Sequence, residues 1–285
     1  MTRRDLLAAA VARLSEAGVE DARRTAEWVI EHATGARRVD LYARPDVVLE
    51  PAEVSLVGRY LDRRAAGEPV QYVIGSADFY GLRLAVTPAV LIPRPETETV
   101  VEHALALVRD RPGPWVLDVG TGSGAVALAV KSERPDAEVF AADVSPAALA
   151  VAAGNAERLG LDVTFVEADA LRPSFADGVP PAFSLVVSNP PYVPAAERAG
   201  LQREVRDHEP ATALFVPDAD PLVFYRALAG HAGRVLEPGG WLVAETHADH
   251  GAAVAALWAE AGLDGAEVRP DLAGRDRVAV ARRPA

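Results

Sequence analysis

The stretch Val116-Leu117-Asp118-Val119-Gly120-Thr121-Gly122-Ser123-Gly124 decides the fold of this chain. It begins as a short apolar strand, turns through three glycines, and leads into a helical pattern over residues 125–131. Glycines at such a turn let the backbone pass close to a ligand, and the following helix offers free N–H groups. The Gly-x-Gly-x-Gly spacing is shorter than the Gly-x-Gly-x-x-Gly of dinucleotide sites, so it favours a compact ligand without a pyrophosphate. A nicotinamide cofactor is the alternative.

From residue 115 onward, short apolar segments alternate with helical ones, which is typical of an α/β fold with a doubly wound parallel sheet. The pattern predicts strands at 115–119, 138–142, 163–167, 184–188, 241–245 and 277–281. It predicts helices at 125–131, 146–159, 221–235 and 252–261. Because ligands bind at the carboxyl ends of the strands in such sheets, we expect the functional residues there.

The first part of the chain has a different pattern. Apolar residues recur at helical spacing over 3–17, 21–34 and 51–67, which predicts a small helical bundle. Aromatic and β-branched residues around two glycines over 71–87 predict a β-hairpin connector. We therefore expect an N-terminal helical domain at 1–70, a hairpin linker at 71–90 and a sheet domain at 91–285.

The composition excludes several classes of protein. The chain of 285 residues has no cysteine, so disulfides, thiolate metal sites and a cysteine nucleophile are excluded. Its formal charge of -12 opposes attraction to phosphate backbones, and short basic stretches such as Arg63-Arg64 are interpreted as solvated helix faces. No apolar run is long enough to span a membrane, and the N-terminus starts an amphipathic pattern rather than a signal peptide. We expect a cytoplasmic protein with no membrane partner and no direct nucleic-acid partner.

Two acids follow predicted strands at the edge where a ligand would lie. Asp143 ends the second strand, where a carboxylate can bind both hydroxyls of a ribose; capping the next helix is the alternative, and Ser145 competes for that role. Asp169 closes the third strand and is a candidate for an adenine edge or a plain loop acid. Ala170 would then lie along the adenine face.

A second motif follows the fourth predicted strand, in the run Ser184-Leu185-Val186-Val187-Ser188-Asn189-Pro190-Pro191-Tyr192. The Asn189 side-chain oxygen and the Pro190 carbonyl can each accept one N–H of a planar NH2 group, which fixes its nitrogen between two acceptors. Tyr192 would pack its ring against the planar group, and Pro190 and Pro191 stiffen the loop. A proline turn that starts with asparagine explains the backbone alone, but not the glycine-rich partner motif.

These residues resemble the protein-(glutamine-N5) methyltransferases that modify the Gly-Gly-Gln loop of bacterial peptide release factors. The resemblance covers nearly the whole chain, and its most selective part is the run Pro93-Arg94-Pro95-Glu96-Thr97-Glu98. The other matching stretches are the glycine-rich turn, Asn189 to Tyr192, Gly67 to Tyr72, Leu91 to Ile92, Glu204-Val205-Arg206 with Glu209-Pro210, and Asp271-Leu272-Ala273-Gly274-Arg275-Asp276-Arg277.

The resemblance implies a doubly wound seven-stranded methyltransferase domain that binds S-adenosylmethionine, with an N-terminal helical domain that docks the protein substrate. The implied cofactor-binding residues are Gly120, Thr121, Gly122, Ser123, Gly124, Asp143, Ala170 and Asn189, and Asp169 joins them as the candidate for the adenine edge. The implied catalytic residues are Asn189, Pro190 and Tyr192, and Asn189, Pro190, Pro191 and Tyr192 bind the glutamine. The expected partner is a peptide chain release factor, the process is translation termination, and the expected state is a monomer without a metal.

Three other functions are weighed against this one. A nucleic-acid methyltransferase acting on the N6 amine of adenine needs the same two acceptors, but also a basic channel that this acidic chain does not advertise. A paralogue that methylates a glutamine of a large-subunit ribosomal protein typically carries a different sequence after Pro93-Arg94. A binding module that has lost its activity is disfavoured because Gly120 and Asn189 are intact.

Some residues near the motifs have two interpretations. Arg94 and Glu96 would either dock the substrate or tie the hairpin to the sheet. The run Glu245-Thr246-His247 departs from the family, which often has glycine soon after the glutamate, and the departure concerns the local backbone turn and not the chemistry. His247 and His250 are three residues apart without a third ligand, so a polar helix start is favoured over a metal pair.

Overall fold

The computed structural model describes residues 1–271 and 273–285. These residues form two compact units, one of Met1–Ser76 with Gln202–His208 and the other of Ala77–Leu201 with Glu209–Ala285. Leu272, which belongs to the C-terminal stretch quoted for the resemblance, lies outside the described residues. None of the helices in the described part of the chain has the length and apolar character that crossing a membrane requires.

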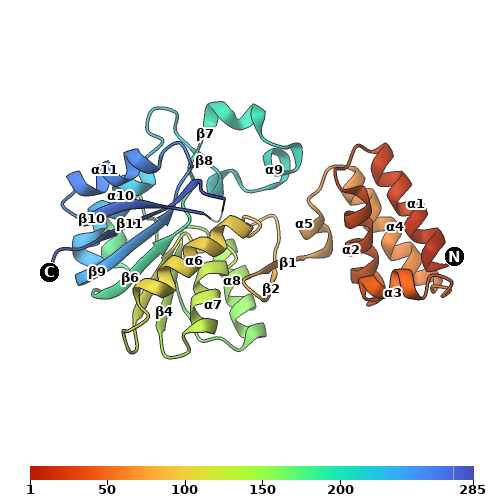
Figure 1. The fold of residues 1–285 in the computed structure, drawn as a ribbon, viewed down its shortest axis with the longest axis horizontal. Coiled ribbons are helices and arrows are strands. Elements are labelled where there is room, and N and C mark those ends of the chain that lie inside the picture. Colours follow the sequence, from red (N-terminus) through yellow and green to blue (C-terminus); the bar gives the residue numbers. More distant parts are fainter. Residues whose placement is uncertain (272) are drawn as a thin grey trace. The chain divides into compact units, whose positions relative to one another are not determined.

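The first unit is a helical bundle (Figure 1). Its helices are α1 (Arg3–Glu16), α2 (Ala22–Thr34), α3 (Arg38–Ala43), α4 (Pro51–Ala65), α5 (Val70–Ile74) and α9 (Arg203–His208). Thr2 caps α1 in a capping box with Asp5, and Gly35 ends α2 in the left-handed region with a φ of 67°. Apolar side chains of α1, α2 and α4 form the core, with Leu14, Ile30 and Leu61 buried in it. The α9 helix is held to α4 by an ion pair of Glu204 with Arg64 at 2.7 Å.

The hairpin is shorter than the segment 71–87 from which it was predicted. Its strands are β1 (Ser76–Phe79) and β2 (Leu82–Ala85), which pair in a two-stranded sheet. The preceding residues form the α5 helix, so the extension of the hairpin back to residue 71 was wrong. The physical reason is at the two ends of α5, because Pro69 starts the helix and Gly75, with a φ of 73°, ends it.

The second unit contains the predicted doubly wound sheet, with seven strands. They are β3 (Trp115–Val119), β4 (Glu138–Asp143), β5 (Thr164–Glu167), β6 (Phe183–Ser188), β9 (Leu236–Glu245), β10 (Asp264–Pro270) and β11 (Asp276–Arg282). Their order is β10-β11-β9-β6-β3-β4-β5, in which β9, β6, β3, β4 and β5 are parallel and β11 is antiparallel to both neighbours. The apolar pattern missed β10, because this edge strand has no buried residue and carries several charges.

Helices cover both faces of this sheet (Figure 1). One face packs against α6 (Pro95–Leu107), α7 (Ala125–Glu133) and α8 (Pro146–Leu159), and the other against α10 (Val223–Val235) and α11 (Gly251–Glu260). Neighbouring strand residues alternate between the two cores: Val243 joins the first, and Leu242 and Ala244 join the second. This alternation follows from the two-residue period of a strand, and burial on both faces explains why the strands are apolar throughout. The predicted fold class is confirmed.

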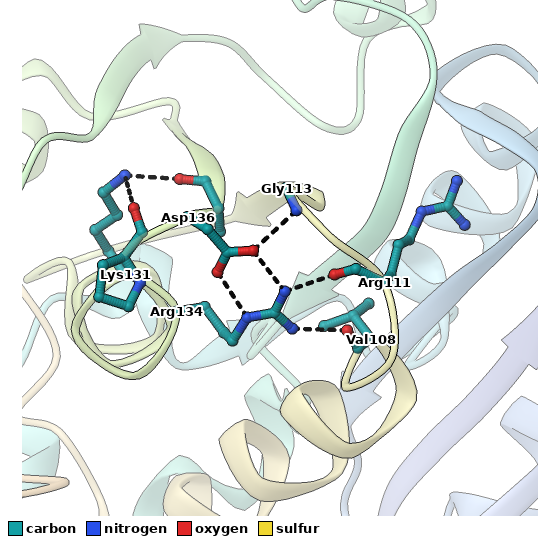
Figure 2. Close-up of polar contacts among 8 residues, drawn as sticks. Val108, Arg111, Gly113, Lys131, Arg134 and Asp136 are labelled. Atoms are coloured by element: carbon teal, nitrogen blue, oxygen red, sulfur yellow. Dashed lines mark hydrogen bonds and ion pairs between the residues drawn. The ribbon is translucent and has the colours of Figure 1, made fainter.

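A polar cluster secures the amino ends of β3 and β4 (Figure 2). Arg134 follows α7 and donates hydrogen bonds to the carbonyls of Val108 and Arg111 and to both carboxylate oxygens of Asp136. Asp136 also accepts from the Gly113 N–H at 2.8 Å, and these bonds hold its pKa well below the usual range. The cluster therefore joins the loops that precede the two strands, at the sheet edge away from their carboxyl ends.

Shorter elements complete the second unit. A two-stranded parallel pair is formed by β7 (Val193–Pro194) and β8 (Phe215–Val216), and three short 3₁₀ helices are η1 (Pro173–Asp177), η2 (Ala195–Gly200) and η3 (Ala211–Ala213). The β7 strand comes directly after the Asn-Pro-Pro-Tyr loop, so its pairing with β8 fixes the path by which the chain leaves that loop.

Candidate functional site

A cavity of about 430 Å³ opens at the carboxyl ends of four adjacent strands of the second unit. Its wall includes residues that follow β3, β4, β5 and β6, together with the start of α6. This is the edge at which ligands bind in open α/β sheets, and the volume lies in the range of small-molecule sites. The position of the cavity agrees with the expectation from the strand pattern.

The glycine-rich turn forms the part of the wall that follows β3. Gly120 and Gly122 have φ values of 75° and 55°, in the region where side chains are disfavoured, and the N–H groups of Gly120 and Thr121 both donate to the Ala142 carbonyl. Gly124 also has a positive φ, of 84°, and a Cβ there would lie 3.0 Å from a methyl carbon of Leu128. The turn therefore needs glycine for two reasons, its backbone conformation and its close packing.

Asp118 is a buried acid beneath this turn. Its Oδ2 accepts hydrogen bonds from the Thr121 hydroxyl at 2.7 Å and from the Ala127 N–H at 3.1 Å. Burial raises the pKa of Asp118 to about 7, although these two hydrogen bonds oppose the shift. The side chain thus joins the end of β3 to the first turn of α7.

Asp143 occupies the cavity wall at the end of β4 and anchors the loops on both sides of it. Its two oxygens accept from the N–H groups of Gly122 and Ser145, each at 2.9 Å. The residue that caps α8 is Ser145, whose hydroxyl accepts from the Ala148 N–H. Of the two alternatives considered for Asp143, helix capping is therefore taken by Ser145.

Asp169 and Ala170 line the cavity after β5. Asp169 accepts from the Leu171 N–H at 2.9 Å and pairs with Arg172, which is largely exposed. The Ala170 carbonyl contacts the His231 ring nitrogen Nε2 at 3.0 Å, so α10 holds this loop in place. Both interpretations of Asp169 remain compatible with these contacts.

The Asn-Pro-Pro-Tyr loop begins where β6 ends. Ser188 donates to the Val119 carbonyl at 2.7 Å, which ties the end of β6 to the end of β3. Asn189 then follows into the cavity wall, and its Nδ2 donates to the Thr97 hydroxyl at 2.9 Å. With its NH2 turned toward Thr97, Asn189 has its Oδ1 as the side-chain atom that can accept from a ligand.

Glu245 lies behind this loop, at the end of β9, and is 1% exposed. Its Oε2 accepts from the Thr97 hydroxyl at 2.6 Å, and its Oε1 accepts from the Tyr192 hydroxyl at 3.3 Å. Burial raises the pKa of Glu245, an effect that the Thr97 hydrogen bond and the charge of Arg277 oppose. Burial likewise raises the pKa of the Tyr192 hydroxyl, which keeps it a donor.

Two charged residues of the Pro93-Arg94-Pro95-Glu96-Thr97-Glu98 run make contacts within the second unit. Arg94 pairs with the buried carboxylate of Glu209, which also accepts from the Ile92 N–H at 3.1 Å. The hairpin is tied to α6 by Glu98, which accepts from the Tyr80 N–H at 2.7 Å. Glu96 is exposed, and its two interpretations, substrate docking and a tie between the hairpin and the sheet, stay predictions.

Most of the residues proposed from the sequence meet in this cavity. Those in its wall are Gly120, Thr121, Gly122, Ser123, Asp143, Asp169, Ala170, Asn189, Pro190 and Pro191. Gly124 and Tyr192 are not part of the wall: Gly124 packs against α8, and Tyr192 turns its hydroxyl to Glu245. The ligand-binding roles of all these residues stay predictions.

Comparison with known proteins decides the family. Residues 5–75 match the family model of the PrmC N-terminal domain, and residues 116–208 match a methyltransferase domain model. The chain is 43% identical to the release factor glutamine methyltransferase of Deinococcus radiodurans over 99% of both chains, and 44% identical to that of Cereibacter sphaeroides over 99% of this chain and 98% of the relative. The chain belongs to the release factor glutamine methyltransferase family. The resemblance inferred from the motifs is thereby confirmed.

Two solved structures of methyltransferases are similar to this family member. A release factor-specific protein-(glutamine-N5) methyltransferase from Alicyclobacillus acidocaldarius is 31% identical and covers 71% of this chain and 100% of its own, with a TM-score of 0.44. A methyltransferase from Pyrococcus furiosus is 18% identical over 72% of this chain and 90% of its own, with a TM-score of 0.51, and shares the fold alone.

The structure of this family member also brings in residues that the motif analysis assigned no role. Thr97 and Glu245 contact the Asn-Pro-Pro-Tyr loop, and Asp118 and the buried Asn155 support the glycine-rich turn. The signal for Asp118 was a lone acid inside an apolar strand. Asn155 sits on the apolar side of a helical pattern, which is a similar signal. Thr97 and Glu245 were quoted within the runs Pro93 to Glu98 and Glu245 to His247, but nothing in those runs indicated that the two side chains contact each other.

The run Glu245-Thr246-His247 keeps a regular path in this family member. The Thr246 N–H donates to the Arg277 carbonyl at 2.7 Å, and the His250 N–H donates to the His247 carbonyl at 3.0 Å in a turn that leads into α11. His250 is the N-cap residue of that helix. Across residues 1–271 and 273–285, no group of three or more His, Cys, Asp or Glu side chains is arranged to hold a metal ion.

Proposed function

We propose that this chain uses S-adenosylmethionine to methylate the side-chain amide nitrogen, N5, of the glutamine in the Gly-Gly-Gln motif of a peptide chain release factor. The observation that carries the proposal is the placement of Asn189 and Pro190 in the same cavity wall as the glycine-rich turn and Asp143. Relatives that are 42% to 44% identical over nearly the whole chain are named release factor glutamine methyltransferase.

The groups that line the cavity suit S-adenosylmethionine. The Asp143 carboxylate lies in the wall with both oxygens already oriented by backbone N–H groups, and it can accept from the two ribose hydroxyls. Asp169 and Ala170 line the adjacent part of the wall, where an adenine would lie. The turn at Gly120 and Gly122 lets the ligand approach the backbone closely.

A dinucleotide fits the fold less well. The dinucleotide-binding fold has strand order 3-2-1-4-5-6 and a longer glycine spacing at its first turn. Here the antiparallel β11 lies between β9 and β10, and the glycines follow the shorter Gly120-x-Gly122-x-Gly124 spacing. Both features support the smaller cofactor.

The chemistry proposed for this chain is orientation rather than proton abstraction. A carboxamide nitrogen is a poor nucleophile because its lone pair is delocalised into the carbonyl. When bound, the cofactor supplies an electrophilic methyl group on a sulfonium sulfur. The Asn189 Oδ1 and the Pro190 carbonyl would each accept one N–H of the glutamine, which presents its nitrogen in a fixed orientation, and orientation alone can contribute about 7 to 11 kcal/mol in the best cases. The proton leaves after the nitrogen has been methylated.

The N-terminal part is proposed to bind the protein substrate. Residues 5–75 match their own family model, and the 1–70 helical domain is assigned to docking, the 71–90 segment to the connector and 91–285 to methyl transfer. Every residue proposed for methyl transfer lies in the second unit of one chain, which supports a monomer as the active form. We place the reaction in the cytoplasm, where translation terminates.

The test is methyl transfer from labelled S-adenosylmethionine to a purified, folded release factor. We expect label on the glutamine of its Gly-Gly-Gln motif and none on a matched release factor with glutamate there, because glutamate keeps the size but lacks the NH2 group. DNA, RNA and isolated ribosomal proteins are offered in parallel. Label on any of these but not on the release factor would refute the proposal in favour of the corresponding alternative, and absence of all transfer would favour a binding module.

A further inference from the structure

The Asn189 amide is connected to a buried carboxylate through one hydroxyl group. Asn189 Nδ2 donates to Thr97 Oγ1 at 2.9 Å, and Thr97 Oγ1 donates to Glu245 Oε2 at 2.6 Å. Thr97 is 4% exposed and Glu245 is 1% exposed, so the hydrogen bond between them is shielded from bulk water. The three residues come from the loop after β6, from α6 and from the end of β9.

The number of protons in this chain of bonds determines its direction. A threonine hydroxyl has a single proton, and the two oxygens of Glu245 both act as acceptors, Oε2 toward Thr97 and Oε1 toward Tyr192. Thr97 therefore gives its proton to Glu245 and presents a lone pair to Asn189. An Asn189 amide flipped by about 180° would place its Oδ1 against that lone pair. The two oxygens, Asn189 Oδ1 and Thr97 Oγ1, would then face each other with no proton between them.

The other oxygen of Glu245 acts on the same loop. Tyr192, the last residue of the Asn-Pro-Pro-Tyr motif, donates its hydroxyl to Glu245 Oε1 at 3.3 Å. Both ends of the four-residue motif are thus connected to one carboxylate: Tyr192 bonds it directly, and Asn189 is connected to it through Thr97. Tyr225 of α10 donates its hydroxyl to the Glu245 backbone carbonyl at 2.9 Å, which fixes the end of β9 itself.

We propose that Thr97 and Glu245 are positioning residues that hold the NH2 of Asn189 away from the substrate and keep its Oδ1 as the acceptor for the glutamine N–H. The proposal rests on the proposed function, because a carbonyl acceptor at this place is useful only for a substrate that brings an NH2 group. Neither residue contacts the reacting atoms. Each acts through Asn189.

The experiment compares two variants at one position. Thr97→Val keeps the shape of the side chain and removes the hydroxyl, whereas Thr97→Ser keeps the hydroxyl. We expect Thr97→Val to lower kcat on the release factor about 10- to 100-fold, as for a misplaced catalytic group, with the Kd for S-adenosylmethionine changed less than about threefold. Thr97→Ser should restore kcat to within about threefold of wild type.

A double-variant cycle tests whether Thr97 acts through Asn189. In an Asn189→Ala background, adding Thr97→Val should cause no further loss of kcat, because the group that Thr97 orients is already gone. An equal loss in both backgrounds would overturn the proposal, as would a Thr97→Val enzyme that keeps wild-type kcat or loses cofactor binding in parallel with activity.

A readout that does not depend on activity is available because the chain has only two asparagines, Asn155 and Asn189. With ¹⁵N-labelled asparagine, the folded protein should give two side-chain NH2 pairs in an NMR spectrum. We expect Thr97→Val and Glu245→Gln to shift the Asn189 pair and speed its hydrogen exchange, with the Asn155 pair unchanged as the internal control. Glu245→Gln is the second variant because it keeps the size but offers one acceptor to two hydroxyls.

Failure of the proposed function and failure of the positioning role give different results. If the wild type methylates no release factor, the proposed function fails, and the NMR comparison still decides how the amide is held. An Asn189 NH2 pair that is unaffected by both Thr97→Val and Glu245→Gln would overturn the positioning role even if the wild type is fully active.

Discussion

The side chain of Asn155 bonds the backbone of Ala85 in both directions. Its Nδ2 donates to the Ala85 carbonyl at 3.0 Å, and its Oδ1 accepts from the Ala85 N–H at 2.7 Å. The same Nδ2 donates to the Ser123 carbonyl at 2.8 Å. A fully buried amide on α8 therefore connects the end of the hairpin to the glycine-rich turn.

Replacing Asn155 should be costly. Asn155→Ala leaves three backbone groups without their partner, so we expect the free energy of unfolding to fall by about 2 to 4 kcal/mol. Urea unfolding measures the change. Glu157→Ala, at an exposed position of the same helix, is the matched control and should stay within about 0.5 kcal/mol of wild type. A loss no larger than that of the control would show that the Asn155 bonds are dispensable.

Gly124 and Gly154 should respond in opposite directions to replacement by alanine. Gly124→Ala forces a side chain onto a φ of 84° and places its Cβ 3.0 Å from Leu128 Cδ1, so we expect a loss of about 1 to 3 kcal/mol in stability. Gly154 lies within α8, with nothing within 4 Å of a built Cβ, and Gly154→Ala should add about 0.5 to 1 kcal/mol. Thermal or urea unfolding of both variants gives the comparison. Changes of the same sign would contradict the packing argument.

The pH dependence of stability should report the buried acid Asp118. Its pKa rises on folding from the ordinary 3.8 to about 7, so the folded protein keeps a proton that the unfolded chain releases. By linkage, this group lowers the free energy of unfolding of the wild type as pH rises from about 4 to about 7. The effect is lost below pH 4, where both states are protonated.

Asp118→Asn isolates that contribution. The variant stays neutral and keeps an oxygen for the Thr121 and Ala127 bonds, so at pH 8 it should be about 2 to 4 kcal/mol more stable than wild type. Urea unfolding at several pH values should show the difference shrinking steadily toward pH 4. A variant that is less stable than wild type at pH 8 would mean that the ionised carboxylate is favoured in the fold.

Calorimetry can separate the two loop acids of the cavity. We expect Asp143→Asn to raise the Kd for S-adenosylhomocysteine roughly 10- to 100-fold, as expected for lost hydrogen bonds to a charged group, and Asp169→Asn to raise it less than about 10-fold. An analogue without ribose hydroxyls supplies the control: it should bind wild type more weakly, yet lose little more on Asp143→Asn. If Asp143→Asn weakens both ligands equally, the carboxylate supports the turn and does not bind the ribose.

Much of the fold followed from apolar periodicity. The predicted strands at 115–119 and 184–188 agree with β3 and β6 to within one residue, because both are buried on two faces and bounded by turn residues. The β9 strand starts five residues earlier than predicted, at Leu236, in a stretch whose proline and two glycines are typical of a turn. The partly exposed β10 has too little apolar character to be detected at all.

The sequence by itself determined the motifs: the glycine turn after one buried strand, the Asn-Pro-Pro-Tyr loop after another, and hence the family. Only the tertiary structure decided that Thr97 and Glu245 stand behind Asn189. Thr97 is 92 residues from Asn189 along the chain, and Glu245 is 148 residues from Thr97. The physical reason is that a local pattern encodes backbone conformation and burial, whereas the partner of a buried hydroxyl or carboxylate depends on which elements pack together. A glutamate at the end of a strand looks the same in sequence whether it faces water or a threonine.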